Sequence, residues 1–449
     1  MTVLQSNPVS MQTKSKAPIK SSFLRTKPVR KLRVEEPQIE FRFSSNKRPL
    51  KSTKKTVYKV ASLFSGCGGL DLGFTGGFSF RHFDFPKTQF KIEFANDIDP
   101  SAELVYNSNK KYFGNHQLIQ SDIKKVDYKS VPDFDFLIAG FPCQPFSNAG
   151  LRKGISDDRG SLFEECEKLL IEGLSRKNKP IGFIFENVKG IMSSKMPNGT
   201  TIPDEIVKRT EKLGFKTTYK LLTASDYGVP TNRQRLIIVG LRKEFDYFNF
   251  SLLNDIVGKN NLPNQQENPY DLFLGSVLCD IPKDAKHKKE YWKYSPSGQF
   301  MVDNIGHCLD GKEALTKFKK RIPLSKISST IKVGKSWKNM NPKKMSERFQ
   351  KIWYNPQKYR APNFYRRFAL GEINGTIIAS AQPENSGITH PFENRRFSIR
   401  EIARIQSFPD DFEFPHKTIA NAYKVIGNAV PPILGWVIAQ ALANHLENE

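Results

Sequence analysis

From residue 57 onward, short apolar runs alternate with polar segments rich in glycine and proline. Runs this short and this continuously apolar are typical of strands buried on both faces of a parallel sheet. We interpret the following runs as strands: 57–64, 90–99, 116–126, 134–139, 181–188, 215–223 and 233–241. A Gly/Pro turn without a helix joins the last two, so the final strand must return antiparallel to its neighbour.

Helical spacing appears between and after these runs. Apolar positions recur every three or four residues in 161–174, and the same spacing returns in 398–408 and 431–446. Two prolines open the last segment, which suits the N-terminus of a helix. Strands that alternate with helices predict an open α/β sheet, in which ligands bind beyond the carboxyl ends of the strands.

One predicted strand ends at a corner that carries a thiol. The segment FDFLIAGFPCQPFS (134–147) is largely apolar up to Gly140 and then places Cys143 in a turn bracketed by prolines. A free cysteine is more often a small buried residue than a nucleophile. Because this one lies at the carboxyl edge of the sheet, Cys143 is a candidate catalytic group.

The first strand opens into a glycine-rich turn, SGCGGLDLGF, before a predicted helix. Its glycines Gly66, Gly68 and Gly69 permit a tight turn and the close approach of a ligand. The spacing is not that of the dinucleotide-binding fingerprint, so a plain strand-to-helix turn is the alternative.

The second strand ends on two carboxylates, Asp97 and Asp99. An acidic side chain at this position suits a ribose with both hydroxyls free. The interval from Gly66 to Asp97 exceeds the usual roughly 20 residues. We therefore expect the Phe-rich segment 75–89 to be an extra element.

The strand 181–188 delivers Glu186 to the same edge as Cys143. A glutamate at a strand end is ordinarily a solvated terminus or a helix cap, but here it is paired with a thiol. Arg233 and Arg235 begin the returning strand and, being two residues apart, are predicted to share a face at this edge. Arg233 could instead be part of a scaffold salt bridge.

Length and cysteine usage limit the class of protein. At 449 residues the chain exceeds the roughly 250 to 300 that one core supports, so we expect two domains plus a tail. The five cysteines form no CxxC pair and are odd in number, which argues for a reducing compartment and against a disulfide framework or a zinc ribbon. We find no metal site, no run of 18 apolar residues and no secretory signal in the sequence.

The net charge of +25 is concentrated in two segments. Residues 1–56 carry a net charge of +11 and have no sustained apolar period, so we interpret them as a disordered tail. That tail could aid solubility, bind phosphates non-specifically or, as a third option, direct the chain to an organelle. Residues 312–367 carry +15 interleaved with aromatic residues, which indicates nucleic-acid binding, although a solvated basic face on a small core is the alternative.

Several segments together resemble the ordered motifs of the DNA cytosine-5 methyltransferase family, over about residues 57–445. These are FSGCGGLDLGF, GFPCQPFS, FENV, YGVPTNRQR, NRRFSIREIARIQSFPDDF and KVIGNAVPP. The resemblance implies a Rossmann-like S-adenosylmethionine-dependent methyltransferase domain, with a mostly parallel sheet and an antiparallel last strand, plus a smaller target recognition domain. It assigns 57–255 and 395–449 to the catalytic domain, 256–394 to target recognition and 1–56 to the tail.

The resemblance also implies roles for individual residues. Cys143 would be the nucleophile, Glu186 the acid that engages the base, and Arg235 with Arg233 the group that holds the flipped cytosine. The residues implied to bind S-adenosylmethionine are Phe64, Gly66, Gly68, Gly69, Asp97, Ile98, Asp122, Ile123, Pro142, Leu162 and Asn428. The chain departs from the family where Asp97 replaces a frequent Glu and where Thr231 replaces a frequent Gln.

The expected function is that of a DNA (cytosine-5)-methyltransferase. Such an enzyme flips a cytosine out of duplex DNA, attacks carbon 6 with a thiolate and transfers a methyl group from S-adenosylmethionine to carbon 5. We expect it to protect DNA from a cognate restriction endonuclease, as a functional rather than physical partner. The alternatives are an RNA cytosine-5 methyltransferase and a catalytically silent DNA-binding regulator.

The same reading sets the expected partners and place of action. We expect a monomer that binds double-stranded DNA in the bacterial cytoplasm, associated with the nucleoid. It would need no metal and no membrane.

Overall fold

The computed structural model describes residues 57–114, 116–142, 162–196, 198–305, 311–327, 336–345, 347–355, 365–380 and 388–449. Contacts along the chain divide it into residues 1–53 and 54–449, close to the predicted end of the tail. The tail itself lies outside the described residues.

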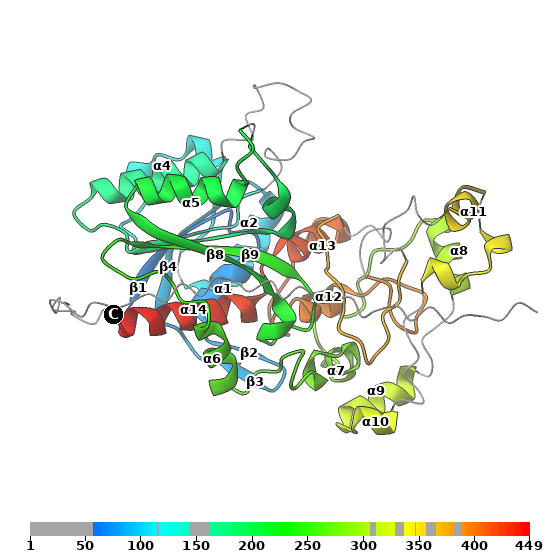
Figure 1. The fold of residues 1–449 in the computed structure, drawn as a ribbon. Helices are drawn as coiled ribbons and strands as arrows, with labels where there is room; N and C mark the ends of the chain where they lie inside the picture. The colour runs from blue at the N-terminus through cyan, green and yellow to red at the C-terminus, as the bar shows by residue number, and fades with distance from the viewer. Residues whose placement is uncertain are drawn as a thin grey trace, which may run out of the picture. The chain divides into compact units, whose positions relative to one another are not determined.

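A seven-stranded sheet forms the centre of the second unit, in the order β5-β4-β1-β6-β7-β9-β8 (Figure 1). Its strands are β1 (Tyr58–Leu63), β4 (Phe90–Asp97), β5 (Ile119–Gln120), β6 (Phe136–Ala139), β7 (Gly182–Val188), β8 (Phe215–Thr223) and β9 (Gln234–Arg242). The pairs from β5 across to β7 are parallel, whereas β9 runs antiparallel to both β7 and β8. The predicted mostly parallel sheet with an antiparallel return is therefore confirmed.

Helices cover both faces of the sheet because its strands are apolar on both sides. In Figure 1, α4 (Leu162–Ser175) and α5 (Ile202–Lys212) lie on one face, and α1 (Gly69–Thr75) and α14 (Pro432–Glu447) lie on the other. Neighbouring residues of β1 accordingly belong to different hydrophobic clusters, Val60 to the one that contains α14 and Ala61 to the one that contains α4.

The first and last helices of the unit are packed directly against each other. An added Cβ on Gly73 of α1 would come within 2.6 Å of the Gly435 backbone in α14, so this contact needs glycine. The stretch Ile419–Glu447, which contains α13 (Ile419–Asn428) and α14, is long and apolar enough to cross a membrane, but 89% of its apolar 18-residue segment is buried. Its burial marks it as part of the core.

The extra segment predicted at 75–89 forms a separate hairpin of β2 (Phe78–Phe80) and β3 (Phe83–Phe85). The Phe85 ring meets Trp436 edge-on at 5.2 Å, and Trp436 Nε1 donates a hydrogen bond to the Pro86 carbonyl. The hairpin thus packs against α14 rather than extending the main sheet.

The described part of 256–394 contains no strand longer than an isolated bridge. Its helices, together with α6 (Leu252–Lys259), which begins just before it, are α7 (Leu274–Cys279), α8 (Pro296–Ile305), α9 (Gly311–Lys319), α10 (Leu324–Ile327) and α11 (Glu347–Trp353). A small hydrophobic cluster around Met301, Trp337 and Tyr365 is separate from the sheet core, whereas Val277 and Phe318 belong to that core. The predicted boundary of a recognition domain stays a prediction.

A ladder of alternating charges links this region to the sheet domain. Arg81, at the tip of the hairpin, pairs with Asp271 at 3.3 Å and with Asp280 at 3.2 Å. Asp280 also pairs with Arg404 of α12 (Ile399–Ile405), at 2.5 Å, and Arg404 pairs with Asp410. Arg81 and Arg404 have side chains that are at most 4% exposed, so each depends on its carboxylates for stability.

Candidate active site

A cavity of ≈600 Å³ lies at the carboxyl ends of the parallel strands. This position follows from the strand order, since β1 lies between β4 and β6 and the crossovers leave it in opposite directions. Of the predicted site residues, the structure places the following around the cavity: Phe64, Gly66, Asp97, Ile98, Asp122, Ile123, Pro142, Leu162, Glu186, Arg235 and Asn428.

The glycine-rich turn after β1 contributes backbone to the cavity. Gly66 has φ +56°, and a Cβ there would meet no atom within 4 Å, so its open side can accept a ligand. Phe64 also lies in the left-handed region at φ 55°, which costs on the order of 1 kcal/mol or more for a non-glycine residue. Strain of this kind concentrates at ligand-binding turns.

Gly68 and Gly69 do not line the cavity, and packing explains both. Gly68 has φ +83°, and an added Cβ would lie 2.5 Å from the Phe113 ring. A Cβ on Gly69 would lie 2.3 Å from the Val430 carbonyl oxygen. These two glycines allow α1 to pack closely against its neighbours, and their role in binding the cofactor stays a prediction.

The carboxylate of Asp97 closes the end of β4 against the turn. Its Oδ2 accepts a hydrogen bond from Gly66 N and its Oδ1 from Asp99 N, both at 2.8 Å. Burial raises the pKa of Asp97 despite these donors. Beside it, Ile98 is 61% exposed, which offers an apolar surface to a flat ring in the cavity.

Asp122 begins the next turn and accepts a hydrogen bond from Lys124 N at 3.1 Å. It lines the cavity with Ile123, which is buried. The third predicted strand shortens to β5, whose two residues are both exposed at the edge of the sheet. Asp122 is thus held by its turn more than by a long strand.

Sequence reasoning missed a buried acid under the cavity, Asp71 of α1. Its Oδ1 accepts from Ser62 Oγ at 2.8 Å and its Oδ2 from Tyr106 Oη at 2.9 Å, and Tyr106 also contacts His116 Nε2 at 2.9 Å. Burial raises the pKa of Asp71 to about 7, because these donors only partly replace the lost solvent. The available signal was a carboxylate in the otherwise apolar sequence GLDLGF.

A second missed feature is an ion pair across the cavity. Lys424 Nζ of α13 lies 2.8 Å from Asp99 Oδ2, and Asp99 caps α2 (Pro100–Ser108) by accepting from Ser101 N. The Asp-Pro pair at 99–100 is a recognisable helix start. Nothing in the sequence around Lys424 indicates its partner.

Glu186 and Arg235 meet at the other end of the cavity. Arg235 Nε lies 2.6 Å from Glu186 Oε1, and both side chains are about nine-tenths buried. The register explains the contact, since β9 pairs Ile237 with Glu186 and places Arg235 two residues away on the same face. A Cβ on Gly140 would lie 3.3 Å from Glu186 Oε2, so glycine gives this carboxylate room.

Cys143 lies outside the described residues, but the chain leading to it is well held. Asn187 Nδ2 donates to the Phe141 carbonyl at 2.9 Å, which fixes the turn after β6. Pro142, the residue before Cys143, lines the cavity. The ENV motif therefore supplies both Glu186 and a hydrogen bond to Phe141, two residues before Cys143.

Arg233 does not share the surroundings of Arg235. It is fully buried outside the cavity lining, where Nη1 donates to the Ile377 carbonyl at 2.7 Å and Nη2 to the Asn428 carbonyl at 3.3 Å. Arg233 precedes β9, so the strand alternation that was expected to align it with Arg235 does not apply. Its hydrogen bonds fit a scaffold role, through carbonyls rather than through a salt bridge.

One cluster of the described residues has ligand atoms that could hold a metal: His287, Glu290 and His416. Phe414 N donates to His287 Nε2, so Nδ1 carries the proton that it directs at Glu290 Oε1, 3.0 Å away. A protonated Nδ1 cannot bind a metal. These hydrogen bonds thus explain why His287 and Glu290 lie close together, and they do not require a metal ion.

The chain matches the family described as C-5 cytosine-specific DNA methylase over residues 58–444. It is 30% identical to the type II methyltransferase M.FnuDI of Fusobacterium nucleatum, over 87% of this chain and 96% of that one. The type II methyltransferase M.NgoPII of Neisseria gonorrhoeae is 29% identical, over 89% and 100%.

Solved structures support the fold. A putative DNA modification methyltransferase encoded within an E. coli prophage superimposes with a TM-score of 0.54 at 22% identity, covering 87% of this chain and 100% of that one. The S. pombe Dnmt2 methyltransferase gives a TM-score of 0.53 at 18% identity, covering 87% and 99%. These likenesses agree with a Rossmann-like methyltransferase sheet.

Proposed function

The chain belongs to the C-5 cytosine-specific DNA methylase family, and from this premise we propose which of its residues methylate carbon 5 of cytosine in DNA. It is a DNA cytosine-5 methyltransferase of the restriction-modification type, as its type II relatives are. The observation that carries our assignment of residues is the Glu186–Arg235 pair, which lines the same cavity as the residue that precedes Cys143.

We propose S-adenosylmethionine as the methyl donor, and the cavity fits this group. The open side of Gly66 leaves room for a part of S-adenosylmethionine that contacts the protein backbone. The Asp97 carboxylate can accept hydrogen bonds from the two ribose hydroxyls, and the exposed Ile98 side chain can pack on the adenine. When bound, it supplies a methyl group on a positively charged sulfur. Asp122, Leu162 and Asn428 would complete the site.

Cys143 would act as the nucleophile. Carbon 5 of cytosine is a poor nucleophile, because using its electrons breaks the conjugation of the ring. Addition of the Cys143 thiolate at carbon 6 turns the neighbouring carbon into an enamine-like nucleophile. After methylation, loss of the carbon 5 proton re-forms the double bond and expels the thiolate.

Glu186 and Arg235 would absorb the charge that this addition creates. Negative charge develops toward nitrogen 3 and the carbonyl oxygen at position 2. A carboxylic acid at Glu186 can share its proton with nitrogen 3, and the Arg235 guanidinium can donate to the oxygen. Their mutual contact at 2.6 Å holds both groups ready before the base arrives.

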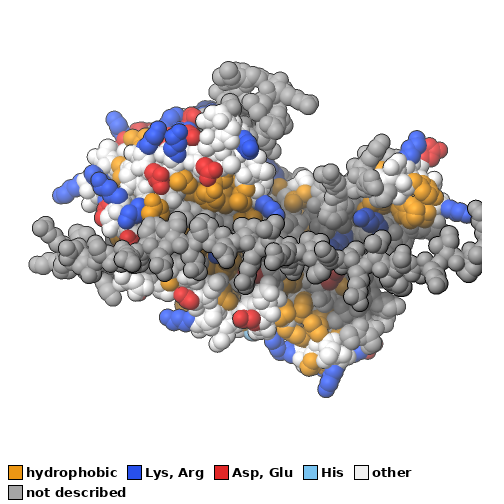
Figure 2. Space-filling view, in the orientation of Figure 1, with side chains coloured by type: hydrophobic (Ala, Val, Ile, Leu, Met, Phe, Trp, Pro, Cys, Tyr) orange, Lys and Arg blue, Asp and Glu red, His pale blue; other side chains and the backbone are white. Residues whose placement is uncertain are grey.

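The target base must leave the duplex to reach these groups. We propose that residues 256–394, with the net charge of +15 in 312–367, bind double-stranded DNA and select the sequence. The face in Figure 2 shows Lys and Arg side chains scattered among acidic and neutral ones over the described part of the chain. The family match favours DNA over the RNA alternative, and we propose that the enzyme works as a monomer.

Bisulfite sequencing of DNA from a bacterium that expresses the chain tests this function. We expect protected cytosines within one short sequence, and none when Cys143→Ser is expressed at the same level. In vitro, wild-type protein should also form a covalent adduct with DNA that contains 5-fluorocytosine at the target position, because the fluorine blocks release of the thiolate. Methylation by Cys143→Ser at near wild-type rates would refute the nucleophile assignment.

A further inference from the structure

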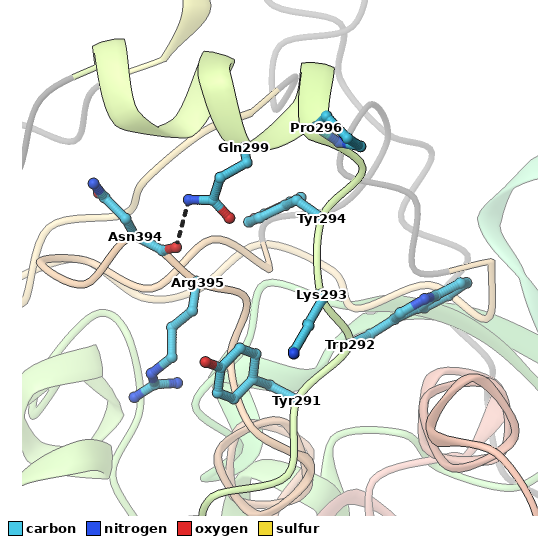
Figure 3. Close-up of a pocket in the computed structure, with 8 residues that line it drawn as sticks. All are labelled: Tyr291, Trp292, Lys293, Tyr294, Pro296, Gln299, Asn394 and Arg395. Carbon is cyan, nitrogen blue, oxygen red and sulfur yellow. Dashed lines mark hydrogen bonds between the residues drawn. The ribbon is translucent and has the colours of Figure 1, made fainter.

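A second cavity, of ≈250 Å³, lies outside the sheet-edge site, where an extended segment before α8 meets the strand-like segment before α12 (Figure 3). It is lined by Tyr291, Trp292, Lys293, Tyr294, Pro296, Gln299, Asn394 and Arg395. In Figure 3, Gln299 and Tyr294 border the space from the top of the view, and Tyr291 and Arg395 border it from below. Three of the eight lining residues, Tyr291, Trp292 and Tyr294, form an aromatic wall, and the others except Pro296 are polar or charged.

The aromatic wall is held in place before any ligand binds. The guanidinium of Arg396 lies over the rings of both Trp292 and Tyr294, at 4.6 and 4.8 Å from their centres. Trp292 N donates to Tyr423 Oη at 3.3 Å, and the Tyr294 hydroxyl lies 2.8 Å from Thr389 Oγ1. A wall fixed in this way loses little side-chain entropy when a flat ring packs against it.

Gln299 presents one hydrogen-bond acceptor to the cavity. Both hydrogens of its Nε2 are used, one on Asp303 Oδ1 and one on the Asn394 carbonyl, each at 2.9 Å. This pairing fixes which end of the amide is oxygen. Oε1 has no donor among the described residues, so it can accept from the amino group of a ligand.

Two cationic side chains line the cavity, and only one of them is paired with carboxylates among the described residues. Arg395 faces Glu393 at 2.6 Å and Glu401 at 2.7 and 3.0 Å, so its charge is balanced and its guanidinium packs over the Tyr291 ring. Lys293 is exposed and makes no ion pair with any described residue. It is free to contact a phosphate.

We propose that this cavity binds one nucleotide of the DNA substrate, at a position other than the target cytosine. The base would pack on Tyr291 and Tyr294, direct an amino group at Gln299 Oε1 and place its phosphate near Lys293. An aromatic ring, an acceptor and a lysine match the three parts of a nucleotide. The inference rests on the proposed function only in that DNA is the ligand.

The test measures the DNA affinity of protein variants for DNA variants and asks whether their effects are coupled. Binding is measured without the methyl donor, so the result does not depend on the role of Cys143. Wild type, Tyr291→Leu and Gln299→Leu are titrated with the duplex that wild-type protein selects by binding from a random-sequence pool, in which each nucleotide in turn is abasic. We expect one non-target abasic position to weaken wild-type binding at least about fivefold. The same lesion should have little further effect on Tyr291→Leu.

A purine that lacks an amino group, placed at that position, should weaken wild type but not Gln299→Leu. Lys293→Ala should lower the slope of log affinity against log salt by about one. The exposed Tyr247→Leu and Lys177→Ala, both outside residues 256–394, serve as matched controls and should match wild type in every measurement. If Tyr291→Leu and Gln299→Leu respond to every abasic position as wild type does, the cavity does not bind a nucleotide and the inference fails, whether or not methylation occurs.

Discussion

Arg235 Nε lies 2.6 Å from Glu186 Oε1, and this pair is the closest contact between groups that we assign to the base. The two side chains come from neighbouring antiparallel strands, so their separation is set by the register of the sheet rather than by a loop. A site built on paired strands holds its groups more precisely than one built on loops.

Breaking this pair should slow methylation. We expect Glu186→Gln and Arg235→Lys each to lower kcat by on the order of 10²- to 10³-fold. The first removes the acid that shares a proton with nitrogen 3, and the second keeps the positive charge but loses the planar guanidinium that donates to the carbonyl oxygen. The double variant should lose less than the product of the two effects, since the residues act as a unit. Arg242→Lys, at the far end of β9 and paired with Glu244, is the control. Fully multiplicative losses would contradict the coupling.

Asp71 should make the fold less stable as pH rises from about 4 to 7. Its pKa is near 3.8 in the unfolded chain and about 7 in the fold, so folding takes up a proton in that window. At about 1.4 kcal/mol per unit of pKa difference, the loss is on the order of 4 kcal/mol. Asp71→Asn, which stays neutral, should lack this fall.

Urea unfolding at several pH values checks this. The free energy of unfolding of Asp71→Asn relative to wild type should increase across the window and then level off. The exposed Asp255→Asn should show no such trend. A difference between wild type and Asp71→Asn that is constant with pH would show that the pKa of Asp71 is the same in the folded and the unfolded chain.

Replacing Asp97 should weaken cofactor binding more than catalysis. Asp97→Asn keeps the shape but loses one of two acceptors for ribose hydroxyls, so we expect Kd for S-adenosylmethionine to rise about 10- to 100-fold. Calorimetric titration measures it directly. Asp84→Asn, on the exposed hairpin, should bind like wild type. An unchanged Kd for Asp97→Asn would remove this residue from the cofactor site.

Deleting residues 1–50 should weaken non-specific DNA binding and flatten its dependence on salt. This segment holds much of the net +11 of the tail, and each phosphate contact contributes roughly 0.9 to the slope of log affinity against log salt. Filter binding on random-sequence DNA between low and moderate salt gives the slope. The methylated sequence should stay the same, and an unchanged slope would leave the tail without a role in binding.

Exchanging the proposed recognition region with that of a relative should transfer the sequence preference. The charge ladder sets where the exchange must begin. A graft that removes Asp271 and Asp280 leaves Arg81 buried without either of its carboxylates, at a cost of about 3 to 5 kcal/mol, and leaves Arg404 with Asp410 alone. We expect a graft of 281–394 to fold better than one of 256–394. A folded chimera that keeps the original preference would contradict the proposed division.

The elements that could be predicted from the sequence are those whose pattern is set by neighbouring residues. The strands at 58–63, 136–139 and 182–188 were predictable because burial on both faces leaves continuous apolar runs. The third strand was overestimated, because at the edge of the sheet only Ile119 and Gln120 pair, and both are exposed. Edge strands give no such run.

Contacts that join distant parts of the chain could not be predicted. Arg233 is held by carbonyls of Ile377 and Asn428, which lie 144 and 195 residues away. The Lys424–Asp99 pair has the same origin, since its partners belong to α13 and to the cap of α2. Local patterns place residues on elements, whereas such pairings depend on how the elements pack.

The contact between Gly73 and Gly435 has a consequence for biosynthesis. The ribosome makes α1 long before α14, so the nascent chain carries an uncovered apolar face through most of its translation. The cavity that we assign to the methyl donor can therefore be completed only near the end of synthesis, because Lys424, Val425 and Asn428 of α13 line it. Fragments released early would be inert toward the host genome and vulnerable to proteases, which ties the appearance of modifying activity to completion of the whole polypeptide.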